Sequence, residues 1–264
     1  MDLDSIFALP SLLLSRLDVA WTMLLLMARF GAFFALVPGL GGGIFGLMIR
    51  YPGVVAISLV SIDPQHATPV PGDPVMMAAQ LASEVLLGTL IALVPLMIVS
   101  GAQVAGGLAS GAMGLNGAQL IDPTTQAQMP DLARLYSDLS ILIFLLMGGH
   151  HVAIAQLAGL DSSVAPGSFI ISGSGVGALI DQSAQIFENG CLLAAPVIAA
   201  LLLTNFVMGV ISKAVPTINI FIVSFPITFA IGLFLSLLAL PEISVSLTKQ
   251  FLELERIFAL VTAR

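Results

Sequence analysis

Two long uncharged stretches stand almost end to end in this sequence. The residues from Asn189 to Ser212 and from Ala214 to Pro241 contain no Asp, Glu, Lys, Arg or His, and only Lys213 separates them. Each stretch is long enough for a helix that crosses a bilayer, which needs roughly 20 apolar residues. They predict a tight helical hairpin with its turn near Pro216, because proline lacks the amide hydrogen that a helix interior requires. Asn219, just inside the second stretch, is expected to find a partner on a neighbouring helix.

Composition places the whole chain in the same class. Of its 264 residues, 58% are hydrophobic and 9% are charged, and the mean hydropathy is +1.08. Soluble domains carry about 25% charged residues. We therefore expect an all-α, polytopic helical membrane protein, one domain over residues 1–264, made of kinked helical hairpins with about five to six hydrophobic helices and a C-terminal amphipathic helix. The predicted hydrophobic segments are 19–37, 44–62, 75–108, 139–157, 186–212 and 217–241, and the amphipathic tail is 242–264.

The tail carries a single apolar stripe at helical spacing. Its members are Leu247, Phe251, Leu254, Phe258 and Val261. The charged residues of the tail, among them Glu253 and Arg256, fall off this stripe. We therefore expect the tail to lie on a partner protein or on the membrane surface.

Arg29, Arg50 and Glu84 each lie inside an otherwise apolar segment. A charged group inside a membrane is costly and almost always faces protein or water. We expect these side chains to be buried against protein, with Arg29 and Glu84 each paired, either with each other or with a neighbouring subunit. Leaving one partner of a buried pair alone costs about 3–5 kcal/mol.

A glycine-rich stretch from Gly106 to Pro123 carries no charge before Asp122. Glycine is unfavourable in a helix interior, so the stretch predicts a loop or a broken helix. Irregular backbone at membrane depth is tolerated only where it is buried in protein or lines a cavity. A close contact between helices through Gly107 and Gly111 explains the same composition, and the sequence leaves both interpretations open.

Enzymatic, metal-binding and nucleic-acid-binding functions find no support in the sequence. The spacing of Gly41, Gly43 and Gly46 fits a dinucleotide fingerprint, but it follows an apolar helix where that motif requires a strand. His150 and His151 are adjacent and do not share a helix face, so they are poor joint metal ligands. No nucleophile–base spacing, Walker loop or basic patch is present. We expect no catalytic residue, no cofactor and no metal.

Several short motifs resemble those of the FliR family of flagellar biosynthesis proteins and its virulence-type counterparts. They are Arg29-Phe30-Gly31-Ala32-Phe33 before Pro38 and Arg50, Glu84 with Gly88, Gly106 before Met113-Gly114-Leu115 and Asp122-Pro123, Gly149-His150, and Pro216 with Asn219 and Phe221. Together they cover about residues 15–241. The chain departs from the family pattern at Thr217, where glutamine is usual, and at Phe45-Gly46, near which a proline is usual.

The resemblance implies a subunit of the export gate of a type III secretion system, most similar to the flagellar one. Its implied partners are FliP-like and FliQ-like paralogous subunits, an FlhB-like protein, unfolded export substrates and membrane lipid, with no nucleic acid. Its implied location is the bacterial inner membrane at the base of the flagellar basal body. Pro216, Asn219 and Phe221 are the implied subunit-packing residues. Family members are thought to lie largely above the membrane plane, so hydropathy segments need not be membrane spans.

A closed export channel must hold back ions, and the glycine-rich stretch has the composition of a seal. An ion in an uncharged, dry constriction loses its hydration, and hydrophobic constrictions can gate by dewetting. We therefore expect a pore plug whose residues are Gly106, Gly107, Gly111, Met113, Gly114, Leu115 and Gly117.

Two other classes of function fit parts of the pattern. A secondary transporter or ion channel would also have broken helices and charges near the midplane, but it should show two related halves, which are not found here. An intramembrane enzyme would need a catalytic pair within apolar helices, and none is evident.

Overall fold

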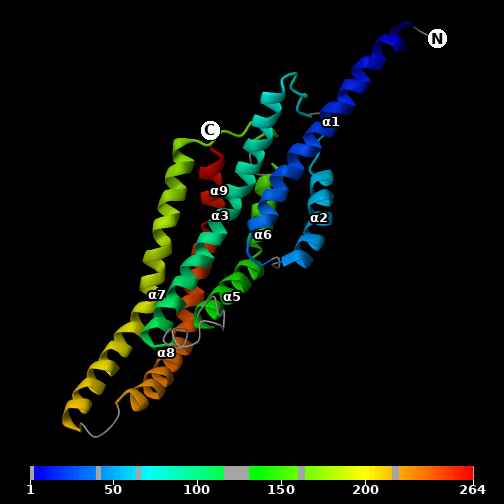
Figure 1. Cartoon of the computed structure of the whole chain (residues 1–264). Helices are drawn as coiled ribbons and strands as arrows, with labels where there is room; N and C mark the ends of the chain where they lie inside the picture. Colours follow the sequence, from blue (N-terminus) through cyan, green and yellow to red (C-terminus); the bar gives the residue numbers. More distant parts are fainter. Residues whose placement is uncertain are drawn as a thin grey trace. The chain divides into compact units, whose positions relative to one another are not determined.

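The computed structural model describes residues 3–39, 43–63, 67–115, 131–159, 164–215 and 220–263. Every regular element in these ranges is a helix (Figure 1). In chain order the helices are α1 (Leu3–Leu36), α2 (Gly43–Val60), α3 (Pro74–Ala112), α5 (Asp131–Leu146), α6 (Gly149–Ala158), α7 (Gly173–Ala214), α8 (Ile220–Leu252) and α9 (Leu254–Thr262). The predicted all-α fold class is confirmed.

Four described helical stretches are long and apolar enough to cross a membrane: Leu17–Leu36, Pro74–Ala112, Gly173–Ala214 and Ile222–Thr262. A fifth span results if α5 and α6 count as one broken span. The predicted segment 139–157 is divided in this way because Gly148 lies between the two helices with a left-handed φ of 71°. The predicted segment 44–62 forms α2, whose apolar part, Arg50–Val60, is shorter than the four spans.

Helix α3 is continuous, and it begins at two residues that favour a helix N-terminus. Asp73 caps it by accepting a hydrogen bond from the amide of Val75 at 3.0 Å, and Pro74 occupies the first turn, where its missing amide hydrogen is not needed. The helix then passes through Pro95 and runs to Ala112. The expected end at Leu108 is therefore too early.

The chain forms two compact units, each made of separate pieces of sequence. Unit 1 contains Met1–Leu96, Gly148–Ile180 and Glu253–Arg264, and unit 2 contains Met97–Met147 and Asp181–Leu252. Helix α3 therefore belongs to unit 1 up to Leu96 and to unit 2 beyond it.

The core of unit 1 is formed by α1, the first part of α3, α6 and α9. Its fully buried apolar side chains include Leu25, Phe30, Phe33, Leu87 and Ile91. A buried hydrogen bond joins the last helix to α6, since the amide nitrogen Nε2 of Gln156 donates to Oγ1 of Thr262 at 2.8 Å.

The apolar stripe of the tail is buried inside the chain itself, which corrects the expectation that it lies on a partner or on the membrane surface. Leu247, Phe251, Leu254, Phe258 and Val261 are each at most 4% exposed. Phe251 packs on Phe144 in unit 2, with ring centroids 5.4 Å apart. Beyond Leu252 the stripe belongs to unit 1, where a Cβ added at Gly175 would lie 3.3 Å from Val261. The same spacing predicts a buried face correctly but does not identify what covers it.

Glycines set the close packing of the helices in unit 2. A Cβ added at Gly190 of α7 would lie 2.7 Å from the side chain of Val104 in α3. A Cβ added at Gly106 would lie 2.5 Å from the carbonyl oxygen of Leu132 and 2.6 Å from the Cα of Ala133 in α5. Small residues allow this close approach of helix backbones in membrane proteins.

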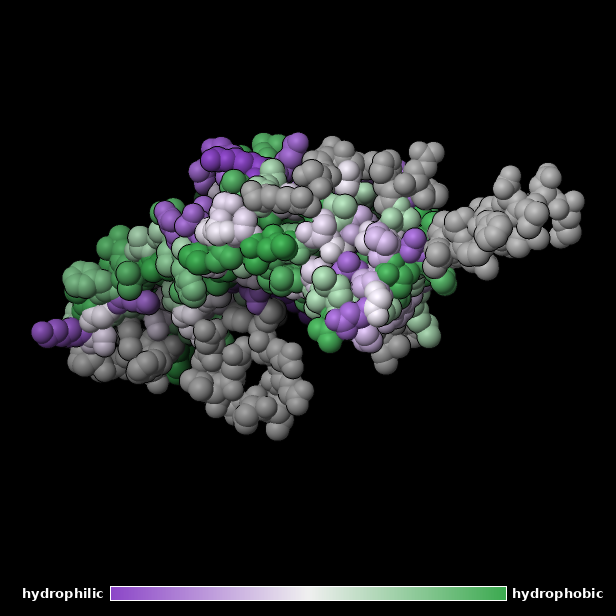
Figure 2. Space-filling view, turned by 90° about the horizontal axis from the view of Figure 1, so that it is seen from above, coloured by the Kyte–Doolittle hydropathy of each residue, from purple (hydrophilic) through white to green (hydrophobic). Residues whose placement is uncertain are grey.

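Helices α7 and α8 leave most of their apolar surface uncovered. In an apolar 18-residue part of each stretch, 61% of the residues are buried for Pro74–Ala112, 28% for Gly173–Ala214 and 17% for Ile222–Thr262. Hydrophobic side chains accordingly occupy much of the face seen in Figure 2. Apolar patches of this kind mark contacts with membrane or with other proteins.

Two neighbouring glycines of α3 offer a matched test of the packing in unit 2. Gly106→Ala should lower the free energy of unfolding by about 1–3 kcal/mol, because its methyl group would overlap the backbone of α5. Nothing lies within 4 Å of a Cβ at Gly107, so Gly107→Ala should change stability by less than about 1 kcal/mol and in the stabilising direction. Denaturant unfolding of the detergent-solubilised protein, followed by circular dichroism, measures both. Equal effects of the two substitutions would contradict the described packing.

Candidate functional site

A fully buried ion pair joins α1 to α3 in unit 1. Arg29 is 1% exposed and Glu84 is 0% exposed. The guanidinium Nε of Arg29 donates to Oε2 of Glu84, and its Nη2 donates to Oε1 at 3.1 Å. This two-point geometry is the strongest arrangement that an arginine and a carboxylate can adopt. The structure therefore pairs the two residues with each other, the first of the two possibilities left open by the sequence.

Two backbone groups from later parts of the chain complete the site. Nη1 of Arg29 donates to the carbonyl oxygen of Leu157 at 2.8 Å, and the amide of Gly167 donates to Oε1 of Glu84 at 2.6 Å. The Leu157 carbonyl lies in the last turn of α6, where carbonyls have no partner within the helix. The ion pair thus ties α6 and the connection after it to α1 and α3. We call these four residues the Arg29–Glu84 cluster.

Gly88 makes room for the cluster. It lies one turn after Glu84 on α3, and a Cβ there would be 2.1 Å from the carbonyl oxygen of Arg29 and 3.1 Å from the Cβ of Ala32. Any side chain at this position would push α1 and α3 apart. The two helices can approach closely enough for the ion pair only because this residue is glycine.

A set of polar contacts beside the cluster fastens the proline-rich connection 67–73 to α1. The amide of Val70 donates to Oδ1 of Asp18, and the amide of Thr68 donates to Oγ1 of Thr22, both at 2.8 Å. Trp21 donates from Nε1 to Oε1 of Gln80 at 2.9 Å. Sequence reasoning missed these contacts. Their signal is weak, because single polar residues spaced three or four apart on an apolar helix do not identify their partners.

A cavity of about 470 Å³ borders the cluster. Thr22, Arg29 and Asp63 bring polar groups to its wall, and Leu26 and Val164 bring apolar ones. The space is partly open to the outside and has room for water beside the polar groups of its wall. The third charged residue predicted from the sequence, Arg50, lies apart from the cluster. It is half-buried, and its Nη1 donates to the carbonyl oxygen of Ala35 at 3.4 Å.

The predicted pore-plug stretch is helical over its first part, so the expectation of a loop or broken helix is wrong for residues 106–112. Gly106 is buried against α5, and its packing contact offsets the low helix propensity of glycine. Gly107 and Gly111 lie on the same helix and neither is buried, and among the described residues nothing lies within 4 Å of a Cβ added at Gly107.

Helix α3 ends in a turn that is anchored to α8. Met113 is 2% exposed and packs on Gly232, where an added Cβ would lie 2.5 Å from Cγ and 2.9 Å from Sδ of the methionine. Gly114 follows with a φ of 83°, and the amide of Leu115 donates to the carbonyl oxygen of Ser110 at 3.2 Å. This is a glycine-terminated helix end. Met113, predicted as part of a plug, is thus the anchor of the turn from which the rest of the stretch departs.

Some predicted residues fall outside the described part of the chain. Gly117, Pro216 and Asn219 are among the undescribed residues, and Phe221 lies in the first turn of α8. Their assignment as plug or subunit-packing residues stays a prediction. Among the described residues, no group of three or more His, Cys, Asp or Glu side chains could hold a metal ion.

Comparison with known proteins gives a consistent set of matches. The family model described as "Bacterial export proteins, family 1" matches residues 20–254. Flagellar biosynthetic protein FliR of Escherichia coli K12 is 30% identical over 161 residues, 61% of this chain and 62% of that protein. FliR of Caulobacter vibrioides is 28% identical over 237 residues, 89% of this chain and 94% of its own length. Yop proteins translocation protein T of Yersinia pestis is 26% identical over 215 residues, 80% of this chain and 82% of that protein. The chain thus spans less than two thirds of the E. coli protein.

The Arg29–Glu84 cluster can be tested with single and double substitutions. Arg29→Leu should lower the free energy of unfolding by about 3–5 kcal/mol, because it leaves the Glu84 carboxylate buried without its cation. The double variant Arg29→Leu/Glu84→Leu should recover a large part of that loss, since it leaves no unpaired charge. Trp21, the single tryptophan of the chain, lies beside the cluster and reports unfolding of unit 1 by fluorescence.

The exposed pair of Arg134 and Asp138, with 3.9 Å between Nε and Oδ2, supplies the control for this experiment. Arg134→Leu removes the same charge from unit 2 and should cost less than about 1 kcal/mol, because solvent screens exposed pairs. Circular dichroism, which reports the helices of both units, measures both substitutions alongside the fluorescence. A small effect of Arg29→Leu, similar to that of Arg134→Leu, would show that the buried pair does not hold unit 1 together.

Proposed function

Because the chain belongs to the bacterial export proteins family 1, we propose that it is a subunit of the inner-membrane export gate of a type III protein secretion system. The proposed system is the flagellar one, in which the chain forms a channel for unfolded export substrates together with FliP-like and FliQ-like subunits and contacts an FlhB-like protein. The family match over residues 20–254 is the observation that carries this proposal. The FliR names of relatives in several bacteria favour the flagellar system.

The uncovered surface of α7 and α8 supports a role in a membrane assembly. Within its own chain, α3 buries most of its apolar length, whereas α7 and α8 bury little of theirs. Such surface must be covered by lipid or by other subunits. A gate that is assembled from several apolar subunits requires this kind of free face.

The Arg29–Glu84 cluster argues against the transporter alternative. In a secondary transporter, charged groups and broken helices near the midplane contact the transported solute. Here the guanidinium and the carboxylate bond to each other and to backbone groups of the same chain. The cluster therefore acts as a structural joint, and the intramembrane charges of unit 1 are already engaged.

The channel seal is proposed to begin at the turn after α3. Met113 holds this turn on α8, and Gly114 redirects the chain. The sequence from Leu115 to Ile121 carries no charge and contains two leucines and an isoleucine. An uncharged segment in a narrow path raises the energy of an ion that must shed its water there. The proposed plug is therefore residues 115–121, with Met113 as its anchor and the glycines of α3 as part of its support.

The assembly is tested by co-expressing the chain with FliP-like and FliQ-like subunits from the same bacterium. A tag on this chain should recover both proteins in a complex of defined mass by native mass spectrometry. Arg29→Leu should reduce the yield of that complex several-fold, because a subunit destabilised by about 3–5 kcal/mol is unfolded more often and is degraded before it assembles. Recovery of this chain alone, as a stable monomer, would sink the export-gate proposal.

Ion-flux recording on the purified complex tests the seal. Deleting residues 115–121 leaves the Met113 anchor in place and should raise the ion leak at least about tenfold, because about 1.4 kcal/mol of lost barrier suffices for that change. Replacing the same residues with a Gly-Ser segment of equal length should also cause a leak, because the segment keeps its length but loses its apolar side chains. Gly107→Ala, where space is open, is the control and should remain tight. A deletion variant that is as tight as the parent would locate the seal elsewhere.

A further inference from the structure

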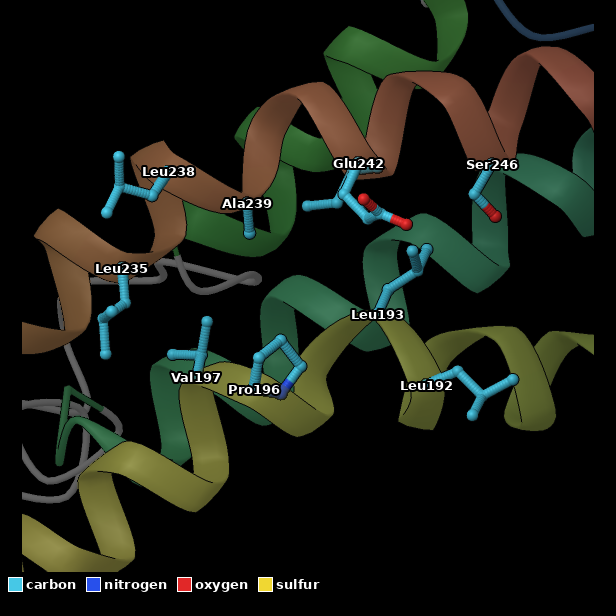
Figure 3. Close-up of a pocket in the computed structure, with 10 residues that line it drawn as sticks. Leu192, Leu193, Pro196, Val197, Leu235, Leu238, Ala239, Glu242 and Ser246 are labelled. Atoms are coloured by element: carbon cyan, nitrogen blue, oxygen red, sulfur yellow. The ribbon is translucent and has the colours of Figure 1, made fainter.

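A groove on unit 2 lies between α7 and α8 and has a volume of about 390 Å³ (Figure 3). Its floor consists of buried apolar side chains, Leu193 and Val197 from α7 and Ile243 from α8. Leu192 and Leu238 stand on opposite rims and are 64% and 61% exposed. On the α8 side of the groove, Ala239 and Ser246 have small side chains that leave space above the helix backbone. Small residues of this kind let the backbone of another helix approach.

A single charged group faces this groove. Glu242 extends from α8 toward α7 above Leu193 (Figure 3). It is the first charged residue after Lys213, directly beyond the uncharged stretch that ends at Pro241. Among the residues that the structure describes, it has no hydrogen bond or ion pair. Glu242 is exposed, and it lies where the uncharged stretch of α8 ends, before the helix itself ends at Leu252. An exposed, unpaired carboxylate beside an apolar groove is complementary to a cation on a protein that docks there.

We propose that this groove receives an apolar helix of another protein subunit, which carries one Lys or Arg that pairs with Glu242. The proposal deepens the export-gate function and rests on it for the identity of the assembly. The apolar floor supplies burial, the small residues allow close approach, and the carboxylate fixes the register of the incoming helix. Because Glu242 lies where the uncharged stretch of α8 ends, the Lys or Arg of the incoming helix should lie opposite this point.

The observations distinguish this occupant from two others. A lipid chain would fill the apolar floor but would leave the carboxylate of Glu242 facing hydrocarbon. A second copy of this chain, joined through the same groove by a two-fold axis, would bring two Glu242 carboxylates together, and like charges at close range repel. A basic residue on an apolar helix can make both contacts. Its apolar stem packs on the floor of the groove, and its charged head pairs with the carboxylate of Glu242.

Photo-crosslinking in native bacterial membranes identifies what lies in the groove. Leu192 and Leu238, one on each rim, are replaced in turn by a photoreactive benzoyl-phenylalanine. Both variants should form an adduct with the same helix of another protein, and that helix should carry a Lys or Arg within about one turn of the adduct on the same face. Since the two side chains are exposed, the replacements are tolerated by the fold. An adduct with lipid only, or with a second copy of this chain, would overturn the proposal.

The role of the carboxylate is tested in the same assay. Glu242→Gln should lower the crosslinking yield about tenfold at limiting partner, which is the effect of losing one charge-assisted contact. Glu255→Gln removes an equal charge from the exposed surface of α9 and should change the yield less than about twofold. Exchanging charges, with Glu242→Lys and an acidic residue at the partner position, should restore the adduct. A yield that does not respond to Glu242→Gln would overturn the proposed pairing.

The outcome for the groove can be separated from the outcome for the assembly. If the adduct falls on a basic apolar helix of a protein unrelated to the FliP-like, FliQ-like and FlhB-like proteins, and none of these co-purifies with the chain, the groove assignment holds and the export-gate proposal fails. If those subunits co-purify with this chain but neither rim position crosslinks to them, the gate proposal holds and the groove assignment fails.

Discussion

A guanidinium and a carboxylate buried in an apolar core govern the arrangement of unit 1. Each would be costly alone, so the packing of the unit must bring them together and satisfy the rest of their hydrogen-bonding capacity. The Leu157 carbonyl and the Gly167 amide do so, and they place the end of α6 and the connection to α7. Gly88 is required for the same reason, because the pair can form only where α1 and α3 touch. One interaction thus positions four pieces of chain.

The presence of this pair could be predicted from the sequence, but its geometry could not. Arg29 and Glu84 stand out because each interrupts an apolar segment, and a buried charge must find a partner. Nothing in the local pattern distinguishes a partner in the same chain from one in a neighbouring subunit. The backbone groups that complete the site are invisible in a sequence for a further reason, since every residue carries them. The glycines at Gly159, where α6 ends, and at Gly167, both with positive φ, are the residue-level signal of these backbone groups.

The glycines of unit 2 also show that a sequence pattern does not identify which residues are in contact. Gly106 and Gly107 are adjacent and identical residues. Gly106 nevertheless touches the backbone of α5, whereas Gly107 faces open space. The many glycines after Gly106 predicted irregular backbone. Residues 106–112 are helical, because close packing offsets the low helix propensity of glycine. The apolar tail gave a similar result, with its stripe buried as predicted but covered by the chain itself. Periodicity identifies which face is buried, and tertiary structure decides against what.

The interleaving of the two units has a consequence for how the chain is made. Unit 1 combines Met1–Leu96 and Gly148–Ile180 with Glu253–Arg264, so it contains pieces that are synthesised both before and after unit 2. The Arg29–Glu84 pair can form once α3 has emerged, but the backbone groups near Leu157 and Gly167 arrive later, and α9 arrives last of all. With translation at about 5–20 residues per second, the nascent chain holds a partly satisfied charge site for several seconds. Until α9 has been synthesised, the side chain of Gln156 on α6 lacks its hydrogen bond to Thr262.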